Sequence, residues 1–229
     1  MICKNRRGCN GKQISNYSHL PKANLVILDY RLYNKLNSRA NLILLKKLGI
    51  ISTESWMEYQ AVIYRLLMNP APSIIDSVHS LMSQFHVNRF AVSIHIRCAG
   101  RLADQKEKTV MVVPRQFSRI AAMVKEELQY TKSSPNHAIF ISSDSSFALR
   151  EIGRLLNSTT IYTNSEVIRG HSDQNQNRSI IHSSFIDLFL LTKSDVFIGV
   201  DRSGYSRVAY GLSDPKRVRW IHVWKHSRI

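Results

Sequence analysis

A histidine and an arginine stand two residues apart at the end of a short apolar run, in the segment VSIHIR. His95 and Arg97 alternate with isoleucines, so in a strand both polar side chains point to one side. Ligands of α/β proteins bind at the carboxyl edge of the strands, and the planar fork of an arginine suits a phosphate. The pair predicts a site for a phosphate-bearing ligand. Taken alone, it also fits a buried histidine and an arginine that only reaches solvent.

Two later segments end predicted strands with polar residues that could bind the same ligand. Asp144 follows the run FISS, where a carboxylate can accept hydrogen bonds from ribose hydroxyls. It could equally cap the helix that follows. The segment DRSG joins a strand to a helix, so Ser203 and the amide of Gly204 could bind a phosphate oxygen at the helix N-terminus. Together these residues predict contacts to the ribose and phosphates of a nucleotide.

One acid lies inside an apolar helical segment. Asp187 stands in SSFIDLFLLT, where a carboxylate is costly unless it is paired or bound to a ligand. A base such as guanine offers two donors to such a carboxylate. The alternative is a surface acid one turn from the helix N-terminus, which the helix dipole favours.

Strands and helices alternate along most of the chain. Runs rich in valine and isoleucine predict strands over residues 24–30, 90–96, 137–143, 159–164, 195–200 and 217–224. Helical spacing of apolar residues predicts helices over residues 40–50, 53–69, 72–87 (with Ser73 as cap), 114–132, 145–157, 183–194 and 204–213, and a polar loop over 166–178. This order is typical of an α/β fold with a Rossmann-like, doubly wound parallel sheet. Such a sheet places Arg97, Asp144 and residues 201–204 along one edge.

Composition narrows the class of protein. The chain has 229 residues and 44% hydrophobic content, enough for one sizeable core, and no apolar run approaches the length of a membrane span. The net charge is +16, and residues 1–50 hold ten lysines and arginines against one acid, Asp29. A basic arm of this kind could bind nucleic acid or an anionic membrane. Because aromatic residues are not interleaved with the basic ones as a stacking platform requires, a solvated face is favoured over a nucleic-acid partner.

The candidate residues stand in an order that resembles a known family. The segments SIHIR, FISSDS and IDLFLLTKSDVFIGVDRSGYSRVAY are similar to the GDP-fucose-binding half of the α-1,6-fucosyltransferases. The nodulation fucosyltransferases and the protein O-fucosyltransferases share this scheme. The likeness spans roughly residues 55 to 225, and its most specific element is the last segment. It implies the C-terminal half of a GT-B glycosyltransferase at residues 53–229, with residues 1–52 as the remnant of an incomplete acceptor-side lobe.

The resemblance also implies roles for individual residues. It assigns contacts to GDP-fucose to six residues: His95, Arg97, Asp144, Asp187, Ser203 and Gly204. Arg97 would neutralise the diphosphate as GDP leaves, Asp187 would bind guanine, and Ser203 would contact the β-phosphate. Transfer of fucose to a glycan or glycoprotein acceptor would proceed with inversion, without a metal or another cofactor.

The chain departs from the family pattern just after Arg97. Cys98 stands where the α-1,6 enzymes carry a second arginine, and Arg101 is a candidate replacement for their lysine. The catalytic base is expected some ten residues after His95, where Asp104 and Glu107 are the nearest acids. The donor side is therefore expected to be more complete than the acceptor side. A noncatalytic nucleotide-sugar-binding protein or a truncated fragment is the second interpretation, and a basic nucleic-acid-binding α/β protein is the third.

The resemblance points to the Golgi lumen. Three sequons, at Asn16, Asn157 and Asn177, permit a secretory location. The N-terminal residues show no signal peptide or anchor, so a cytoplasmic protein or a partial chain is the alternative.

Overall fold

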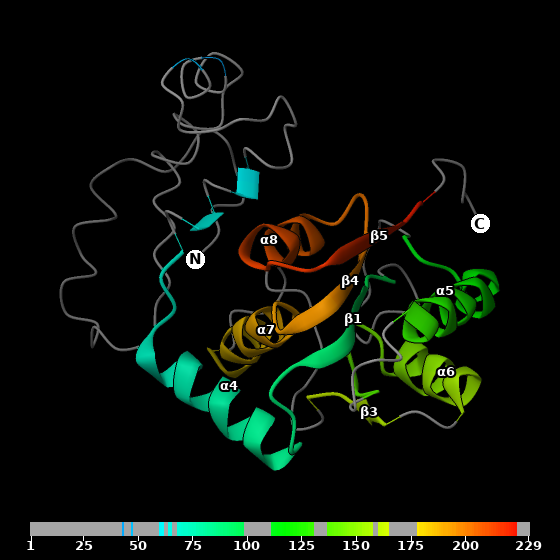
Figure 1. The fold of residues 1–229 in the computed structure, drawn as a ribbon, viewed down its shortest axis with the longest axis horizontal. Helices are drawn as coiled ribbons and strands as arrows, with labels where there is room; N and C mark the ends of the chain where they lie inside the picture. The colour runs from blue at the N-terminus through cyan, green and yellow to red at the C-terminus, as the bar shows by residue number, and fades with distance from the viewer. Residues whose placement is uncertain are drawn as a thin grey trace.

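Within the part of the chain that the structure describes, five parallel strands form one sheet in the order β3-β2-β1-β4-β5 (Figure 1). This computed structural model describes residues 68–98, 111–130, 137–157, 160–164 and 178–223, together with residues 43, 47, 60, 61, 64 and 65. The strands are β1 (Phe90–Ile96), β2 (Ile139–Ser143), β3 (Ile161–Tyr162), β4 (Ser194–Val200) and β5 (Arg217–Ile221).

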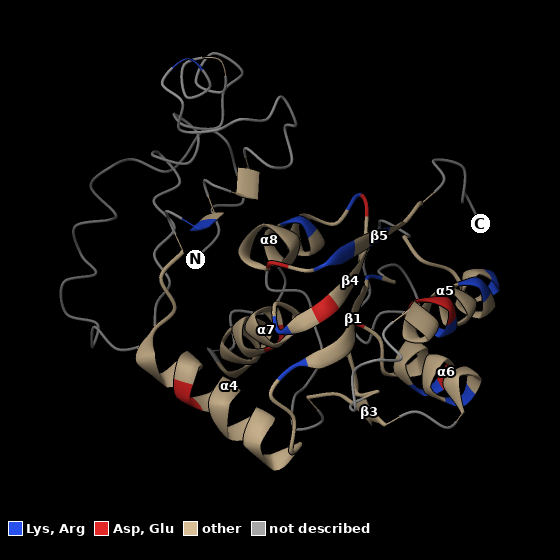
Figure 2. Ribbon diagram, viewed as in Figure 1, with Lys and Arg blue, Asp and Glu red and all other residues tan. Residues whose placement is uncertain are grey.

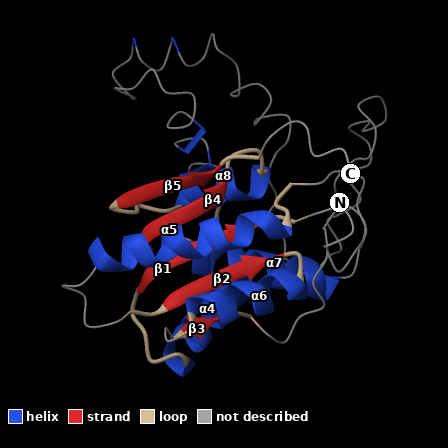
Figure 3. Cartoon of the chain, turned by 90° about the vertical axis from the view of Figure 1, so that its right-hand side faces the viewer, coloured by secondary structure: helices blue, strands red, loops and turns tan. Residues whose placement is uncertain are grey.

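Helices cover both faces of this sheet, as Figures 1 and 3 show. On one face lie α5 (Phe117–Tyr130), which follows the short 3-10 helix η2 (Pro114–Gln116), and α6 (Ser146–Leu156). On the other face lie α4 (Pro72–Gln84), α7 (Arg178–Leu191) and α8 (Gly204–Leu212). The fold is therefore the three-layered α/β arrangement predicted from the alternating elements.

The two faces of the sheet are packed by different side chains. Val92, Ile94 and Ile96 of β1 belong to the cluster that α5 and α6 cover. The opposite cluster contains the aromatic rings of Phe90, Phe140 and Phe197, which come from three adjacent strands. Because both faces are dry, the strands consist of nearly continuous apolar runs rather than of alternating polar and apolar residues.

The order of the strands creates a switch point beside β1. From β1 the chain moves outward to β2 and β3, and it then returns to the other side of β1 to form β4 and β5. In open α/β sheets, ligands bind outside the carboxyl ends of the strands where the direction of winding reverses. The end of β1, with His95 and Arg97, lies at this point.

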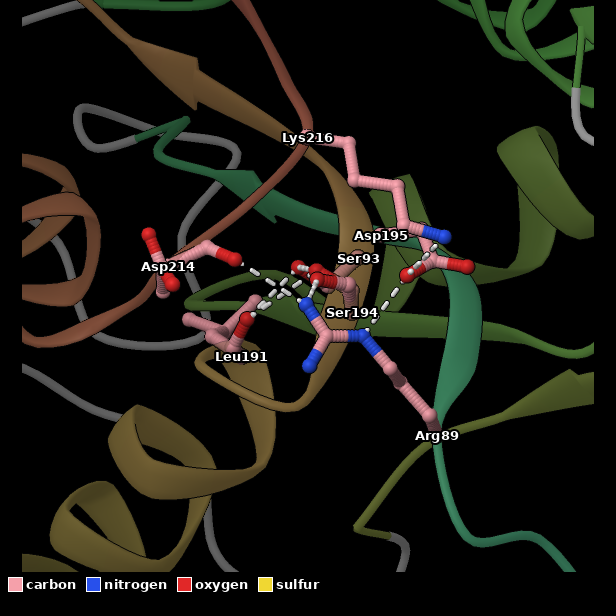
Figure 4. Close-up of polar contacts among 7 residues, drawn as sticks. All are labelled: Arg89, Ser93, Leu191, Ser194, Asp195, Asp214 and Lys216. Atoms are coloured by element: carbon pink, nitrogen blue, oxygen red, sulfur yellow. Dashed lines mark hydrogen bonds and ion pairs between the residues drawn. The ribbon is translucent and has the colours of Figure 1, made fainter.

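A network of ion pairs and hydrogen bonds joins the opposite, amino-terminal edge of the sheet (Figure 4). Arg89, directly before β1, donates to a carboxylate oxygen of Asp195 (2.8 Å) and to the carbonyl oxygen of Ser194 (2.6 Å). Lys216, directly before β5, lies 3.3 Å from the same carboxylate. The network ties the starts of β1, β4 and β5 together, on the edge away from the switch point.

Part of the basic charge is used inside the fold. Glu127 of α5 is fully buried and accepts from Arg219, while Arg217 lies 3.2 Å from its second carboxylate oxygen. In Figure 2 the acidic segment of α5 and the basic segment of β5 are both visible. Because a buried carboxylate needs partners, these two arginines have a structural role.

The structure corrects three local predictions. Ala71, not Ser73, is the N-cap of α4, and Pro72 occupies the first helical position. Helix α7 begins at Arg178, five residues before the predicted start at Ser183. Strand β3 is shorter than the predicted run 159–164. The predicted strand 24–30 and the loop over 166–177 lie outside the described residues. Of the predicted helices 40–50 and 53–69, the structure describes residues 43, 47, 60, 61, 64 and 65 as helical. The division at residue 52 stays a prediction.

Gly211 of α8 provides a test of the packing of α8 against Ala61 and Tyr64. A Cβ atom on Gly211 would lie 2.9 Å from the Cα atom of Ala61 and 2.7 Å from the ring of Tyr64. We expect Gly211→Ala to lower the free energy of unfolding by about 1–3 kcal/mol, because the backbone must move to admit the methyl group.

Gly153 is the matched control, since a Cβ there meets only the side chain of Ile161, at 3.9 Å. Gly153→Ala should raise the free energy of unfolding by about 0.5–1 kcal/mol, because alanine is the better helix former. Urea unfolding measures the free energy of unfolding of both variants. An equal change in the two variants would show that the contact to Ala61 does not constrain α8.

Candidate functional site

The carboxyl edge of the sheet brings the five predicted ligand-binding side chains, and the backbone of Gly204, to neighbouring elements. His95 and Arg97 come from the end of β1, Asp144 follows β2, and Ser203 follows β4. Asp187 reaches the same edge from α7, because its carboxylate contacts Ser142 in β2. All five are buried except Arg97, which is partly exposed.

Arg97 and Asp144 form an ion pair across the ends of β1 and β2. The Nε atom of Arg97 lies 3.4 Å from one carboxylate oxygen of Asp144. The other carboxylate oxygen accepts from the backbone N–H of Cys98 at 2.8 Å. Asp144 therefore holds the segment that follows β1 and orients the Arg97 guanidinium. The alternative role of Asp144 as a helix cap is wrong, because Ser145 caps α6 by accepting from the N–H of Ala148.

His95 is buried against helix α8. Its Nδ1 atom lies 2.6 Å from the hydroxyl oxygen of Ser206, and its ring lies 4.7 Å from the ring of Tyr205, measured between centroids. Burial, with a smaller contribution from the positive charge of Arg97, lowers the pKa of His95 to about 3. The imidazole is therefore neutral at physiological pH and acts as a hydrogen-bonding group rather than as a cation.

Asp187 is buried in the third turn of α7. Its carboxylate accepts from the hydroxyl of Ser142 at 2.8 Å, and Ser142 pairs with His95 in the register of β1 and β2. Burial and the negative charge of Asp187 raise the pKa of Tyr205 well above its usual value. The alternative of a surface acid one turn from the helix start is wrong, since α7 begins nine positions earlier and Asp187 is only 9% exposed.

Ser203 is the N-cap of α8. Its hydroxyl oxygen accepts from the N–H of Ser206 at 3.3 Å. Among the described residues no acceptor is found for the hydroxyl proton of Ser203, which can therefore be donated to an anion at the helix start. Gly204 is exposed, and a Cβ atom on it would contact nothing within 4 Å. The backbone at the start of α8 is thus open to approach.

Cys98 occupies the position after Arg97 as a core residue. Its side chain is fully buried in the cluster beneath α5 and α6. Burial, followed by the nearby charge of Asp144, raises the pKa of its thiol to about 12. The thiol is therefore protonated and does not act as a nucleophile or as an anion-binding group.

Three residues of the site escaped the sequence analysis: Ser142, Tyr205 and Ser206. Ser142 could have been found from its spacing, because it lies two residues before Asp144 and so on the same side of the strand. Tyr205 and Ser206 carry no such signal, since their contacts depend on how α8 packs against β1.

The candidate catalytic residues Arg101, Asp104 and Glu107 lie outside the described residues. Within the described ranges no group of three or more histidine, cysteine or acidic side chains is placed to hold a metal ion. The described helices are all too short or too polar to cross a bilayer.

Comparisons with known proteins gave matches among solved structures. A scan against models of protein families found no match, and a search of the curated proteins found none. POFUT1 in its apo form is similar over 74% of this chain and 50% of that chain, with 12% identity and a TM-score of 0.45. The fucosyltransferase NodZ from Bradyrhizobium is similar over 68% of this chain and 47% of that chain, with 16% identity and a TM-score of 0.44.

A further similar structure is that of POFUT1 in complex with GDP-fucose, with 11% identity and a TM-score of 0.44 over 75% of this chain. The chain spans about half the length of these solved structures.

Proposed function

We propose that this chain binds GDP-fucose at the carboxyl edge of the sheet, as the donor side of a GT-B fucosyltransferase. The observation that carries the proposal is the gathering of His95, Arg97, Asp187 and Ser203 beside the switch point between β1 and β4. A guanidinium and a helix N-terminus suit a diphosphate, and a buried carboxylate suits the two donors of guanine. GDP-fucose, the nucleotide sugar that the sequence resemblance implies, contains both guanine and a diphosphate.

In this proposal the diphosphate binds between Arg97 and the start of α8. Asp144 orients the guanidinium through its ion pair at 3.4 Å. The hydroxyl of Ser203 and the open backbone at Gly204 donate to the β-phosphate. Each of these donors acts on charge that grows as GDP leaves, which is the usual source of electrostatic catalysis.

Transfer would follow from attack of an acceptor hydroxyl on the anomeric carbon of fucose. The new bond forms from the acceptor oxygen, the bond from the anomeric carbon to the β-phosphate oxygen breaks, and the acceptor proton passes to a base. We propose Asp104 or Glu107 as that base, with Arg101 as a second cation near the leaving diphosphate. A glycan or glycoprotein is the expected acceptor, no metal is expected to take part, and the Golgi lumen is the expected location.

A second function, binding without transfer, is favoured by Cys98. The position at which the α-1,6 enzymes carry a second arginine is here a buried core residue with a protonated thiol. Among the described residues, Arg97 is then the one cation at the end of β1 that could stabilise the leaving group. Release of GDP from GDP-fucose in the presence of glycopeptide acceptors distinguishes transfer from binding alone.

Calorimetric titration of the full chain with GDP, GDP-fucose, ADP and UDP tests the proposed function. We expect GDP and GDP-fucose to bind at least about tenfold more tightly than ADP or UDP, a difference of about 1.4 kcal/mol. Equal affinity for all four nucleotides, or no heat with GDP, would contradict the proposal. Tight binding of DNA or RNA with a steep loss of affinity in salt would instead support the nucleic-acid-binding alternative.

A further inference from the structure

The hydroxyl of Ser206 joins three elements at the candidate site. It accepts from the backbone N–H of Val200, at the end of β4, at 3.0 Å, and it lies 2.6 Å from Nδ1 of His95 in β1. Ser206 itself belongs to the first turn of α8 and is fully buried. We propose that Ser206 is a positioning residue that fixes the tautomer of His95, with the ring proton on Nε2.

The assignment follows from counting donors and acceptors on the two side chains. The Val200 N–H can only donate, so the Ser206 oxygen accepts in that bond. If Nδ1 of His95 also donated to this oxygen, the hydroxyl proton of Ser206 would need another acceptor. Among the described residues His95 is the sole candidate, because the hydroxyl of Ser206 has no further partner there. A buried hydroxyl without an acceptor is costly. Ser206 therefore donates to Nδ1, which leaves the ring proton on Nε2.

The surroundings hold the ring in this state. Among the described residues, the charged and titratable groups around His95 are Arg97 on its own strand, Asp144 paired with Arg97, Asp187 from α7, and Tyr205 from α8. The Tyr205 ring lies against the imidazole, and Tyr205 is itself anchored by donating to the carbonyl oxygen of Ser184 at 2.5 Å. Burial and the charge of Arg97 lower the pKa of His95 to about 3, so the imidazole is neutral at any pH well above that value. One tautomer thus persists over the working pH range.

The consequence for binding is a neutral donor of fixed direction. His95 is 5% exposed, and no described residue partners its Nε2 atom. Resting on the proposed function, the Nε2–H group donates to an acceptor oxygen of the bound nucleotide sugar. A ring in the other tautomer would present a lone pair to that oxygen and repel it. Ser206 therefore acts on affinity through His95, without a contact of its own to the ligand.

Nitrogen NMR of the full chain labelled at its histidines tests the tautomer directly. The His95 signals are identified by their absence in His95→Gln. We expect Nδ1 to have the shift of an unprotonated nitrogen and Nε2 that of a protonated one, unchanged between pH 5 and 8. In Ser206→Ala the two shifts should move toward each other as both tautomers become populated, and Ser206→Thr should restore the original pair. A proton on Nδ1 in the wild type would overturn the proposal. So would His95 shifts in Ser206→Ala that are the same as those of the wild type.

Ser213→Ala is the matched control. Ser213 is a buried serine at the other end of α8 that donates to the carbonyl oxygen of Tyr210. Its removal should leave the His95 shifts unchanged, whereas a change equal to that in Ser206→Ala would show a general loosening of α8 and overturn the positioning role.

Titration with GDP-fucose then separates this inference from the proposed function. Its diphosphate is a diester whose charge is constant over this pH range, so the affinity reports on the protein. Ser206→Ala should weaken binding about five- to tenfold, and Ser206→Thr and Ser213→Ala should bind like the wild type. If the wild type does not bind GDP-fucose, the proposed function fails while the tautomer result stands. If the wild type binds and Ser206→Ala binds equally well, the role of Ser206 in binding fails.

Discussion

Arg97→Ala is expected to weaken the binding of GDP and GDP-fucose by about 100-fold, which corresponds to about 2.7 kcal/mol. The loss reflects the removal of two charge-assisted hydrogen bonds to the diphosphate from a guanidinium that Asp144 holds in place. Arg97→Lys should recover part of the affinity, because an ammonium group keeps the charge but not the planar fork. Calorimetric titration measures the affinity of the wild type, Arg97→Ala and Arg97→Lys for GDP-fucose.

The fold should also lose stability in Arg97→Ala, because the buried carboxylate of Asp144 loses its ion pair with the guanidinium. We expect a decrease of about 2 kcal/mol in the free energy of unfolding. Titrations are therefore run well below the melting temperature of each variant. Circular dichroism confirms that the variant is folded under those conditions.

Arg89→Ala is the matched control for this prediction. Arg89 and Arg97 flank the same strand, and each pairs with a carboxylate, but Arg89 lies at the amino-terminal edge with Asp195. Its removal should cost about 1 kcal/mol of stability and leave the affinity for GDP unchanged. Equal losses of GDP affinity in the two variants would place the ligand elsewhere than at the carboxyl edge.

Asp187→Asn is expected to remove the preference for guanine. The asparagine oxygen can still accept from Ser142, so the buried contact at 2.8 Å survives. One acceptor of the carboxylate becomes an amide donor, which opposes the two donors of guanine. We expect the affinity for GDP to fall about 10- to 100-fold, while the weaker affinities for ADP and UDP stay within about threefold. Competition titrations with the three nucleotides measure the change.

Asp195→Asn controls for the loss of an acid from the fold. Asp195 is paired with Arg89 and Lys216 at the far edge of the sheet. Its substitution should lower stability without changing the order of affinities among the nucleotides. If Asp187→Asn still prefers GDP to ADP as strongly as the wild type does, Asp187 does not contact the base.

The fold was predictable because the spacing of apolar residues along the chain indicates most of its strands and helices. The run Phe90–Ile96 is buried along its whole length, and it was read as a strand from its apolar residues alone. Polar residues directly after such runs, as at Arg97 and Asp144, must lie at the carboxyl edge once the sheet is parallel. The sequence predicts the start of α7 too late because the polar run over 166–178 indicates a loop, although Ile181, Phe185 and Leu188 stand at helical spacing.

The contacts within the site were not predictable in the same way. His95 and Ser206 are 111 positions apart, Ser142 and Asp187 are 45 apart, and Cys98 and Asp144 are 46 apart. Each contact depends on the register of two strands or on the packing of a helix against the sheet. Periodicity along the chain contains no information on either quantity.

The sequence by itself determined the order of strands and helices and the edge at which the polar residues gather, because both follow from residue spacing and from parallel winding. Only the tertiary structure decided that Asp144 holds Arg97, that Ser142 binds Asp187 and that Ser206 contacts His95. It also decided that Cys98, one position after Arg97, is a core residue. Adjacent residues at a strand end face opposite layers, and the helices that cover each layer settle what surrounds each side chain.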